Sequence, residues 1–294
     1  MGHIKQEKLI EQFKTLGKSI KVTYGKYEVP AACTPSDLEW NQMDQDHRPW
    51  IHSTYLTSLR VAVTPDAQLS VTRLKRFFYI PFFVSVSDVR VSPGLFYQGF
   101  TIFNLLYVHV VTRCRPGLHT GEWYIVSHPI FTPLHWLLNK KLVEMNTEQN
   151  LEDIPLRDRR ADLRARGYGF AHENPDFITA NLKTNNVIFP KMIQVQSVKL
   201  APLVQGQHNS VKIGPIELLI RPDGNGHYSV WNEVCPHEGG PMKKGKVCGD
   251  EIQCPWHGLK FSAAKLSPEN PSADLGSLHF ELESQSGELR VSSR

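Results

Sequence analysis

Two short clusters near the C-terminal end of the 294-residue chain combine thiol and imidazole side chains. The first is Cys235-Pro-His237 and the second is Cys254-Pro-Trp-His257. Two sulfur and two nitrogen ligands suit an unsymmetrical [2Fe–2S] cluster, with both cysteines on one iron and both histidines on the other. A tetrahedral structural zinc site is the alternative, although zinc sites usually pair cysteine with cysteine and histidine with histidine. The two clusters therefore predict electron transfer.

The loops that carry these ligands resemble the Rieske proteins in spacing and flanking residues. Strand-like runs at 228–231 and 251–254 precede the ligands, and glycine and proline let the loops turn tightly. Respiratory members of that family carry two more cysteines, which form a disulfide, and a serine that hydrogen-bonds a cluster sulfur. The matching positions here are Gly240, Pro255 and Leu259. The resemblance therefore implies the lower-potential cluster of the oxygenase and ferredoxin type.

A second motif, Asp44-x2-His47-x4-His52 preceded by Asn41, is similar to the mononuclear iron site of ring-hydroxylating Rieske oxygenases. The resemblance implies that His47 and His52 bind Fe(II). Asp44 and His47 are three residues apart and share a helix face, whereas His52 requires Pro49 to break or distort the helix. Surface histidines in a loop after a charged helix start are the alternative reading of this segment.

The resemblance also implies a carboxylate that completes the iron site from late in the catalytic domain. The segment 152–156, Glu-Asp-Ile-Pro-Leu, matches that context. We expect Asp153 to be the ligand, with Glu152 and Glu148 as the other candidates. The alternative is a solvated, ion-paired helix face, because the acidic residues lie among Arg157, Arg159, Arg160, Arg164 and Arg166.

Asp44 has its own implied role, because family members arrange their subunits in a ring that brings one cluster beside the next subunit's iron. In them a buried aspartate bridges a cluster histidine and an iron histidine. The resemblance therefore implies a homo-oligomer, a trimer, in which Asp44 is a catalytic residue linking His47 to His237 or His257 of a neighbouring subunit. A helix N-cap or a first-turn acid is the alternative.

The pattern of the remaining chain predicts an α+β protein of two domains. Apolar runs alternate with polar breaks from about 58 to 130, which indicates an antiparallel sheet, and the pattern from 133 to about 166 is helical. A sheet that grips a long helix encloses an apolar pocket. We expect a helix-grip-like catalytic domain over 1–192 and a small all-β Rieske domain over 193–294, which reverses the usual order in the family.

Composition limits the partners and the compartment. The 33 basic and 29 acidic residues give a charge of +4, which is too mild to indicate nucleic-acid binding. Three further cysteines, Cys33, Cys114 and Cys248, form no disulfide framework and favour a reducing cytosol. The first residues have no apolar signal-peptide core, and runs such as 77–84 are too short to span a bilayer. We expect a cytoplasmic protein, with peripheral membrane association as an open alternative.

Together, the motifs and the resemblance imply a Rieske-type non-haem iron oxygenase component, a mono- or dioxygenase with a [2Fe–2S] cluster and a mononuclear Fe(II). It would use O2 and electrons from a ferredoxin or flavin reductase to hydroxylate, demethylate or desaturate a small apolar organic substrate. Lys243, Lys244 and Lys246, between the two ligand pairs, are candidates for docking an acidic electron donor, and a solvated loop is the alternative. The competing functions are an electron carrier whose N-terminal domain is not catalytic and a zinc-stabilised interaction protein.

Overall fold

The computed structural model describes two compact units of the chain, which are Met1–Ala161 with Asn174–Asn181, and Asp162–Glu173 with Leu182–Arg294. The expected domain boundary after residue 192 stays a prediction. The residues that the structure describes are 8, 11, 12, 15, 21–31, 34–77, 80–102, 105–115, 117–171, 186–192, 194–200, 203–283 and 286–293.

The first unit is built on an antiparallel sheet, which has seven strands in the described part of the chain. Their order is β1-β7-β6-β5-β4-β3-β2, so that each strand from β2 to β7 pairs with the next and β1 closes against β7. Short turns such as the one at Gly94, with φ of 70°, allow this meander. The strands are β1 (Lys21–Ala31), β2 (Tyr55–Val63), β3 (Ala67–Phe77), β4 (Ile80–Ser92), β5 (Leu95–Ile102), β6 (Leu106–Arg115) and β7 (Gly117–Ser127).

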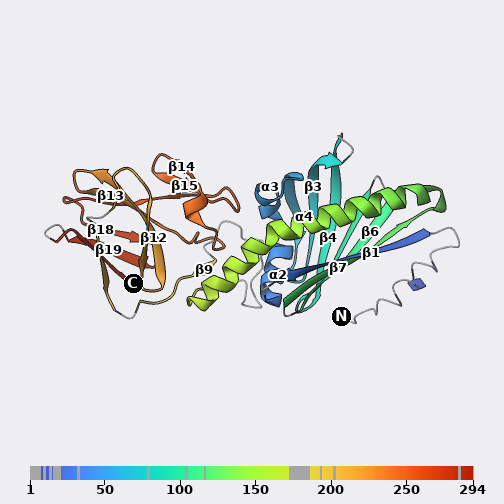
Figure 1. Ribbon diagram of the computed structural model, residues 1–294, viewed down its shortest axis with the longest axis horizontal. Helices are drawn as coiled ribbons and strands as arrows, with labels where there is room; N and C mark the ends of the chain where they lie inside the picture. The colour runs from blue at the N-terminus through green and yellow to red at the C-terminus, as the bar shows by residue number, and fades with distance from the viewer. Residues whose placement is uncertain are drawn as a thin grey trace. The chain divides into compact units, whose positions relative to one another are not determined.

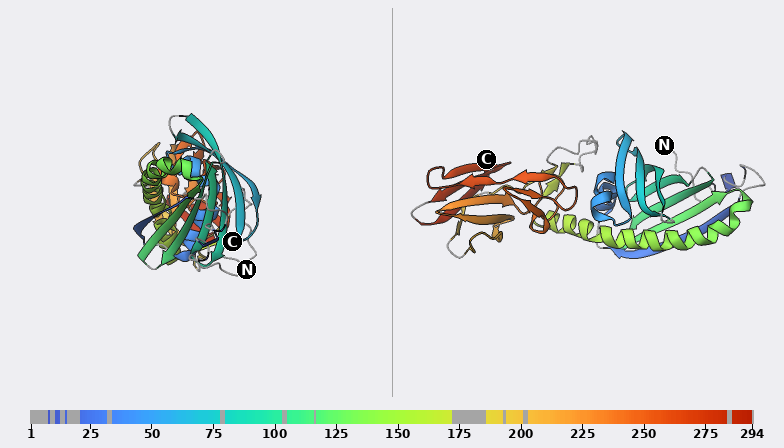
Figure 2. Two further views of the ribbon diagram at one scale, coloured as in Figure 1. Left: turned by 90° about the vertical axis from the view of Figure 1, so that its right-hand side faces the viewer. Right: turned by 90° about the horizontal axis from the view of Figure 1, so that it is seen from above.

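The long helix α4 (Thr132–Ala165) lies along one face of this sheet (Figures 1 and 2). Its Leu138 and Leu142 share a buried core with sheet residues such as Val108 and Trp123. The Trp123 indole also donates a hydrogen bond to Asn139 on the helix at 2.8 Å. Burial of this apolar stripe supplies most of the stability of such a helix. The predicted antiparallel sheet with a long helix is therefore confirmed.

Three short helical segments connect β1 to β2: α2 (Pro35–Met43), η1 (Gln45–His47) and α3 (Arg48–Ile51). Thr34 begins α2 with a reciprocal capping box, in which Thr34 and Asp37 each satisfy the other's backbone N–H. The expected helix break at Pro49 is wrong in position. The chain leaves the helix at Asp44, with φ −88° and ψ 83°, and Pro49 lies in the first turn of α3, where its missing N–H costs no hydrogen bond.

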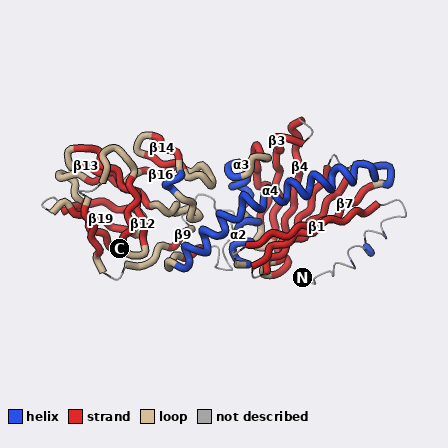
Figure 3. Tube along the Cα trace, in the orientation of Figure 1, coloured by secondary structure: helices blue, strands red, loops and turns tan. Residues whose placement is uncertain are grey.

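The second unit is all-β apart from the end of α4 and short 3-10 turns such as η4 (Met242–Lys244), as the described part of the tube in Figure 3 shows. Two four-stranded antiparallel sheets share one buried core, β10-β20-β19-β18 and β11-β12-β13-β17. A three-stranded sheet, β14-β15-β16, and a short pair, β8-β9, complete it. The predicted all-β cluster domain is confirmed.

The strands of this second unit are mostly short. They are β8 (Gly169–Phe170), β9 (Val187–Ile188), β10 (Gln196–Lys199), β11 (Asn209–Ile213), β12 (Ile216–Gly224), β13 (His227–Asn232), β14 (Lys246–Cys248), β15 (Glu251–Gln253), β16 (Lys260–Ser262), β17 (Ala264–Leu266), β18 (Ser272–Leu275), β19 (Leu278–Glu283) and β20 (Glu288–Ser293).

No helix among the described residues combines the length and the apolar character needed to cross a bilayer. Cys235, Cys248 and Cys254 are free thiols. Cys33 and the side chain of Cys114 lie outside what the structure describes.

Candidate metal centres

The two ligand loops of the second unit close in the same way. In each loop, the cysteine N–H donates to the carbonyl five residues later, and the N–H four residues later donates back to the cysteine carbonyl. These bonds are Cys235–Gly240 at 2.9 Å and Gly239–Cys235 at 2.9 Å in the first loop, and Cys254–Leu259 at 2.7 Å and Gly258–Cys254 at 2.9 Å in the second. Gly239 and Gly258 have φ of 88° and 67°, a backbone region that favours glycine. The sequence therefore folds both loops into equivalent turns.

The four predicted cluster ligands are buried together at these turns. The rings of His237 and His257 are 4.6 Å apart between centroids, and their Nδ1 atoms face each other at 3.3 Å. The thiols of Cys235 and Cys254 share a hydrogen bond, which lowers the pKa of Cys254 to about 7, whereas burial raises the pKa of Cys235. Paired thiols beside paired imidazoles fit a cluster with two sulfur and two nitrogen ligands.

Gly240 is required by the close approach of the two loops. A Cβ atom at this position would lie 2.6 Å from Cys254 Sγ, closer than real Cβ atoms come to other heavy atoms. The loop-linking cysteine of the respiratory type would therefore not fit here without a shift of the backbone.

The first residue of β9 and the residue before it support the first loop. Asn186 donates from its side chain to Glu238 at 2.7 Å and from its backbone to the His237 carbonyl at 3.1 Å. Val187 donates to the Pro236 carbonyl at 3.0 Å. These contacts hold the backbone on both sides of His237, which fixes the imidazole.

The first unit brings the three predicted iron ligands together. His47 lies at the end of η1, His52 directly follows α3, and Asp153 is on α4. Asp153 Oδ1 is 3.4 Å from His47 Nε2 and 3.2 Å from His52 Nε2. Three atoms bound to one metal at right angles and about 2.1 Å would lie about 3 Å apart. One ligand atom from each residue lies within 4.8 Å of the others.

Two acidic residues orient the histidines from outside this group. Glu152 accepts a hydrogen bond from His52 Nδ1 at 2.8 Å, and Asp44 Oδ2 lies 3.5 Å from His47 Nδ1. Each contact leaves the Nε2 atom to face Asp153. Among the described residues, both ring nitrogens of His47 and Asp153 Oδ1 are buried without a hydrogen-bond partner, so Nε2 and Oδ1 could bind a metal. The two other candidates for the third iron ligand lie elsewhere. Glu152 contacts His52 from outside the group, and Glu148 is exposed.

The charges in this group are strongly coupled. Burial lowers the pKa of His47, but the neighbouring carboxylates of Asp153 and Asp44 raise it to about 9. Burial raises the pKa of Asp153, but His52, His47 and Arg157 lower it well below its ordinary value. Asp153 is thus an anion at neutral pH, and a bound cation would take the place of the proton on His47.

Arg157 holds the other oxygen of Asp153. It is fully buried and donates to Asp153 Oδ2 at 3.2 Å, to Asn41 Oδ1 at 2.7 and 3.1 Å, and to His119 Nδ1 at 2.8 Å. With Oδ2 engaged, Asp153 presents Oδ1 alone to the two histidines. The alternative reading of this segment, a solvated and ion-paired helix face, is wrong for Asp153 and Arg157, because both are buried.

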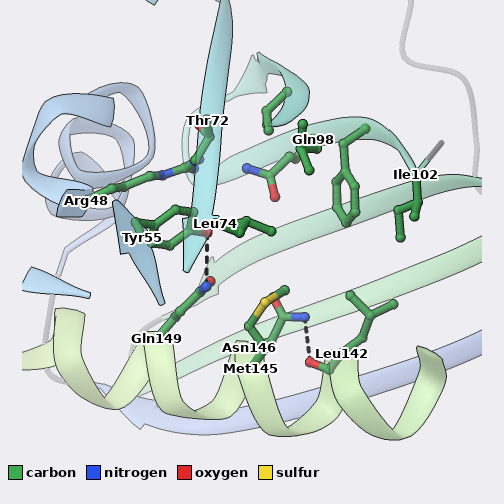
Figure 4. Close-up of a pocket in the computed structure, with 13 residues that line it drawn as sticks. Arg48, Tyr55, Thr72, Leu74, Gln98, Ile102, Leu142, Met145, Asn146 and Gln149 are labelled. Atoms are coloured by element: carbon green, nitrogen blue, oxygen red, sulfur yellow. Dashed lines mark hydrogen bonds between the residues drawn. The ribbon is translucent and has the colours of Figure 1, made fainter. Parts of the chain in front are cut away.

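Two cavities that share lining residues lie at the triad and beside it, and Figure 4 shows the one beside it. One is polar and contains His47, His52 and Asp153. The other is mainly apolar, with Leu74, Val84, Val86, Phe100, Ile102, Leu142 and Met145 in its wall. Five residues line both cavities: Arg48, Tyr55, Gln98, Asn146 and Gln149. The expected apolar pocket between sheet and helix therefore adjoins the triad, and sequence patterns had not indicated these five residues.

Buried His109 on β6 should make the stability of the first unit depend on pH. Burial lowers its pKa from 6.5 to about 4, so the unfolded chain takes up the proton first as the pH falls. The contribution of neutral His109 to the free energy of unfolding should be complete above about pH 6.5. It should be lost as the pH falls from there to 4, at up to about 1.4 kcal/mol per pH unit. Urea unfolding at pH 7.5 and pH 5 should show a smaller difference for His109→Gln than for the wild type. Exposed His128→Gln is the control, and equal pH slopes in all three proteins would contradict the prediction.

Comparisons with known proteins address the second unit. The Rieske [2Fe-2S] domain profile matches residues 192–274. The oxygenase component of chloroacetanilide N-alkylformylase from Rhizorhabdus wittichii is 41% identical over 58 residues, 20% of this chain and 17% of that protein. The oxygenase component of 3-ketosteroid-9-alpha-monooxygenase from Mycolicibacterium smegmatis is 40% identical over 66 residues, 21% of this chain and 17% of that protein. Apoptosis-inducing factor 3 from Mus musculus is 32% identical over 92 residues, 31% of this chain and 15% of that protein.

The chain therefore spans less than a fifth of the length of the curated relatives that it matches. Among solved structures, the di-domain ARO/CYC StfQ aligns with a TM-score of 0.44 and 10% identity, over 53% of this chain and 55% of that one.

Proposed function

Because residues 192–274 form a Rieske [2Fe–2S] domain, we propose that the chain is a Rieske-type oxygenase component whose first unit holds a mononuclear iron. The convergence of His47, His52 and Asp153 outside the Rieske domain carries this proposal. An electron carrier needs no second site with two histidines and one carboxylate, whereas non-haem iron oxygenases use this ligand set. The apolar residues of the adjoining cavity would contact a small apolar organic substrate.

The chain's own residues prepare this site. Glu152 and Asp44 turn the Nε2 atoms of His52 and His47 toward Asp153, and Arg157 fixes which oxygen Asp153 presents. Iron held there would supply activation of O2, with electrons arriving through the cluster. The apolar wall would exclude water from the substrate's reacting end.

Electrons would come from a ferredoxin or flavin reductase, and Asp44 would link His47 to His237 or His257 of another subunit in a homo-oligomer, a trimer. The burial of Asp44, with its Oδ2 at 3.5 Å from His47 Nδ1, supports this proposal for the half of the link within one chain. Relatives named as oxygenase components support the assignment of a separate electron donor.

The iron content of the purified protein tests the proposal. An oxygenase component should hold about three irons per chain, two in the cluster and one mononuclear, whereas a carrier with a non-catalytic first unit should hold about two. EPR of the reduced protein should show the cluster, and a high-spin ferrous centre should bind nitric oxide as an EPR-visible adduct. A protein with two irons and no such adduct would favour the carrier, and a colourless zinc protein would exclude both.

Donor docking can be tested at three exposed lysines, Lys243, Lys244 and Lys246. Alanine at all three should slow cluster reduction by an acidic ferredoxin about tenfold at low ionic strength, because steered association depends on charge. Stopped-flow reduction at low and high salt measures this. The matched control removes three exposed lysines elsewhere in the unit: Lys191, Lys199 and Lys212. Equal rates for the two triple variants would exclude the docking role.

A further inference from the structure

Arg48 is a buried cation that faces the cavities without a matching anion. Its side chain is at the start of α3 and the residue is 9% exposed. Among the residues that the structure describes, its guanidinium donates no hydrogen bond and forms no ion pair. Its recorded contact is with the Tyr55 ring, whose centroid is 5.5 Å from Arg48 Cζ. A guanidinium is always charged and has five N–H donors, so burial without an acceptor is unfavourable.

Asp88, the buried carboxylate whose field reaches Arg48, does not fill this role. Its pKa is raised by burial and lowered by Arg48, so the two groups interact at a distance. Both of its oxygens already accept amide N–H groups. Gln98 donates to Oδ1 at 2.7 Å, and Gln45 and Gln68 donate to Oδ2 at 2.9 and 3.3 Å. Asp88 therefore offsets part of the charge and leaves the guanidinium N–H groups for a ligand.

The three amide side chains shared by the two cavities each donate an N–H to a protein acceptor. Gln98 donates to Asp88, Gln149 donates to the Tyr55 hydroxyl at 2.9 Å, and Asn146 donates to the Leu142 carbonyl at 2.7 Å. Figure 4 shows Arg48 reaching from its helix toward Thr72 at the wall of the apolar cavity. Arg48 is thus the strong donor that a ligand in this cavity would meet.

We infer that the site binds an amphipathic organic acid, whose carboxylate pairs with Arg48 and whose apolar body fills the cavity beside Phe100, Leu142 and Met145. The planar guanidinium matches a carboxylate with two parallel hydrogen bonds, which a neutral amide or ester would not provide. This inference names the substrate class of the proposed oxygenase and so rests on that function. It refines the expected apolar substrate by giving it an anionic end.

Calorimetric binding of matched probes tests the inference. The probes are 3-phenylpropionate and decanoate, each compared with its primary amide, on the purified holoprotein without reductant. The wild type should bind the acids at least about tenfold more tightly than the amides, because hydrogen bonds between charged groups are stronger than neutral ones. Arg48→Met should weaken acid binding about tenfold to a hundredfold and change amide binding less than about threefold. Arg48→Lys keeps the charge but not the planar pair of N–H donors. Its affinity for the acids should lie between those of the wild type and Arg48→Met.

Two controls locate the effect. Arg90→Gln removes an arginine that is already paired with Asp66 and Glu39 and should leave acid binding unchanged. Met145→Trp should fill the apolar cavity and weaken acids and amides together. Wild-type protein that binds no acid, binds acids and amides equally, or keeps acid selectivity in Arg48→Met would overturn the inference, as would unchanged binding in Met145→Trp.

The binding measurement is independent of turnover. A wild-type protein without mononuclear iron that still prefers the acids would refute the oxygenase proposal and keep the anion site. A protein with three irons that shows no acid preference would refute the anion site alone.

Discussion

Replacing His47 with alanine should lower the iron content from about three atoms per chain to about two, while the visible absorption and EPR signal of the reduced cluster stay unchanged. Loss of one imidazole leaves His52 and Asp153 as two ligands, which are too few to hold Fe(II) against dilution. Because the cluster ligands belong to the other compact unit, their loops should fold as before. Metal analysis after desalting and EPR of the same sample measure both results, and substrate oxidation should fall to background.

Matched variants decide which carboxylate completes the site. Asp153→Asn keeps the side-chain shape but loses the charge and should lose the same iron as His47→Ala. Glu152→Gln should keep some iron and bind it about tenfold to a hundredfold more weakly, because Glu152 only orients His52. Exposed Glu148→Gln should match the wild type. Retention of three irons in His47→Ala would show that the mononuclear site is elsewhere or absent.

The cluster loops were the most predictable part of the chain, because their chemistry and turns are local. Each loop carries its ligands within four residues, and glycine follows where a positive φ is needed. The profile match confirms the Rieske domain. The sheet and the long helix were predictable from alternation and helical periodicity, since burial of one face sets both patterns.

The first unit's site was predictable only in part. His47 and His52 belong to one short motif, but where the chain bends between Asp44 and His52 depends on packing, and a proline in the sequence pointed to the wrong residue. Arg157 resembles the other arginines of α4 in sequence, and only the fold places it against Asn41, 116 residues away. The proposed role of Arg48 likewise depends on a cavity whose wall is formed by several strands and α4. Contacts between residues that are far apart in the chain cannot be predicted from local sequence patterns.

Arg157→Met should destabilise the first unit by about 3–5 kcal/mol, because it leaves the buried charge of Asp153 and the Asn41 carbonyl without donors. Methionine fills much of the same volume, so the loss reports the hydrogen bonds more than a cavity. Thermal and urea unfolding followed by tryptophan fluorescence measure it. Arg159→Lys, a substitution at a partly exposed arginine on the same helix, should change stability by less than about 1 kcal/mol.

The same residue should also set the metal affinity, through the oxygen that Asp153 presents. Arg157→Lys keeps the positive charge but donates from a single point, so it cannot hold Asp153 Oδ2 and Asn41 Oδ1 together as the guanidinium does. Co(II) titration of the iron-free first site should show about tenfold to a hundredfold weaker binding in this variant, with a changed ligand-field spectrum. If loss of orientation is the cause, Asn41→Ala, which keeps the Arg157–Asp153 contact, should weaken Co(II) binding less than Arg157→Lys. Equal affinities in the wild type and Arg157→Lys would mean that packing around the helix, and not Arg157, holds Asp153 in place.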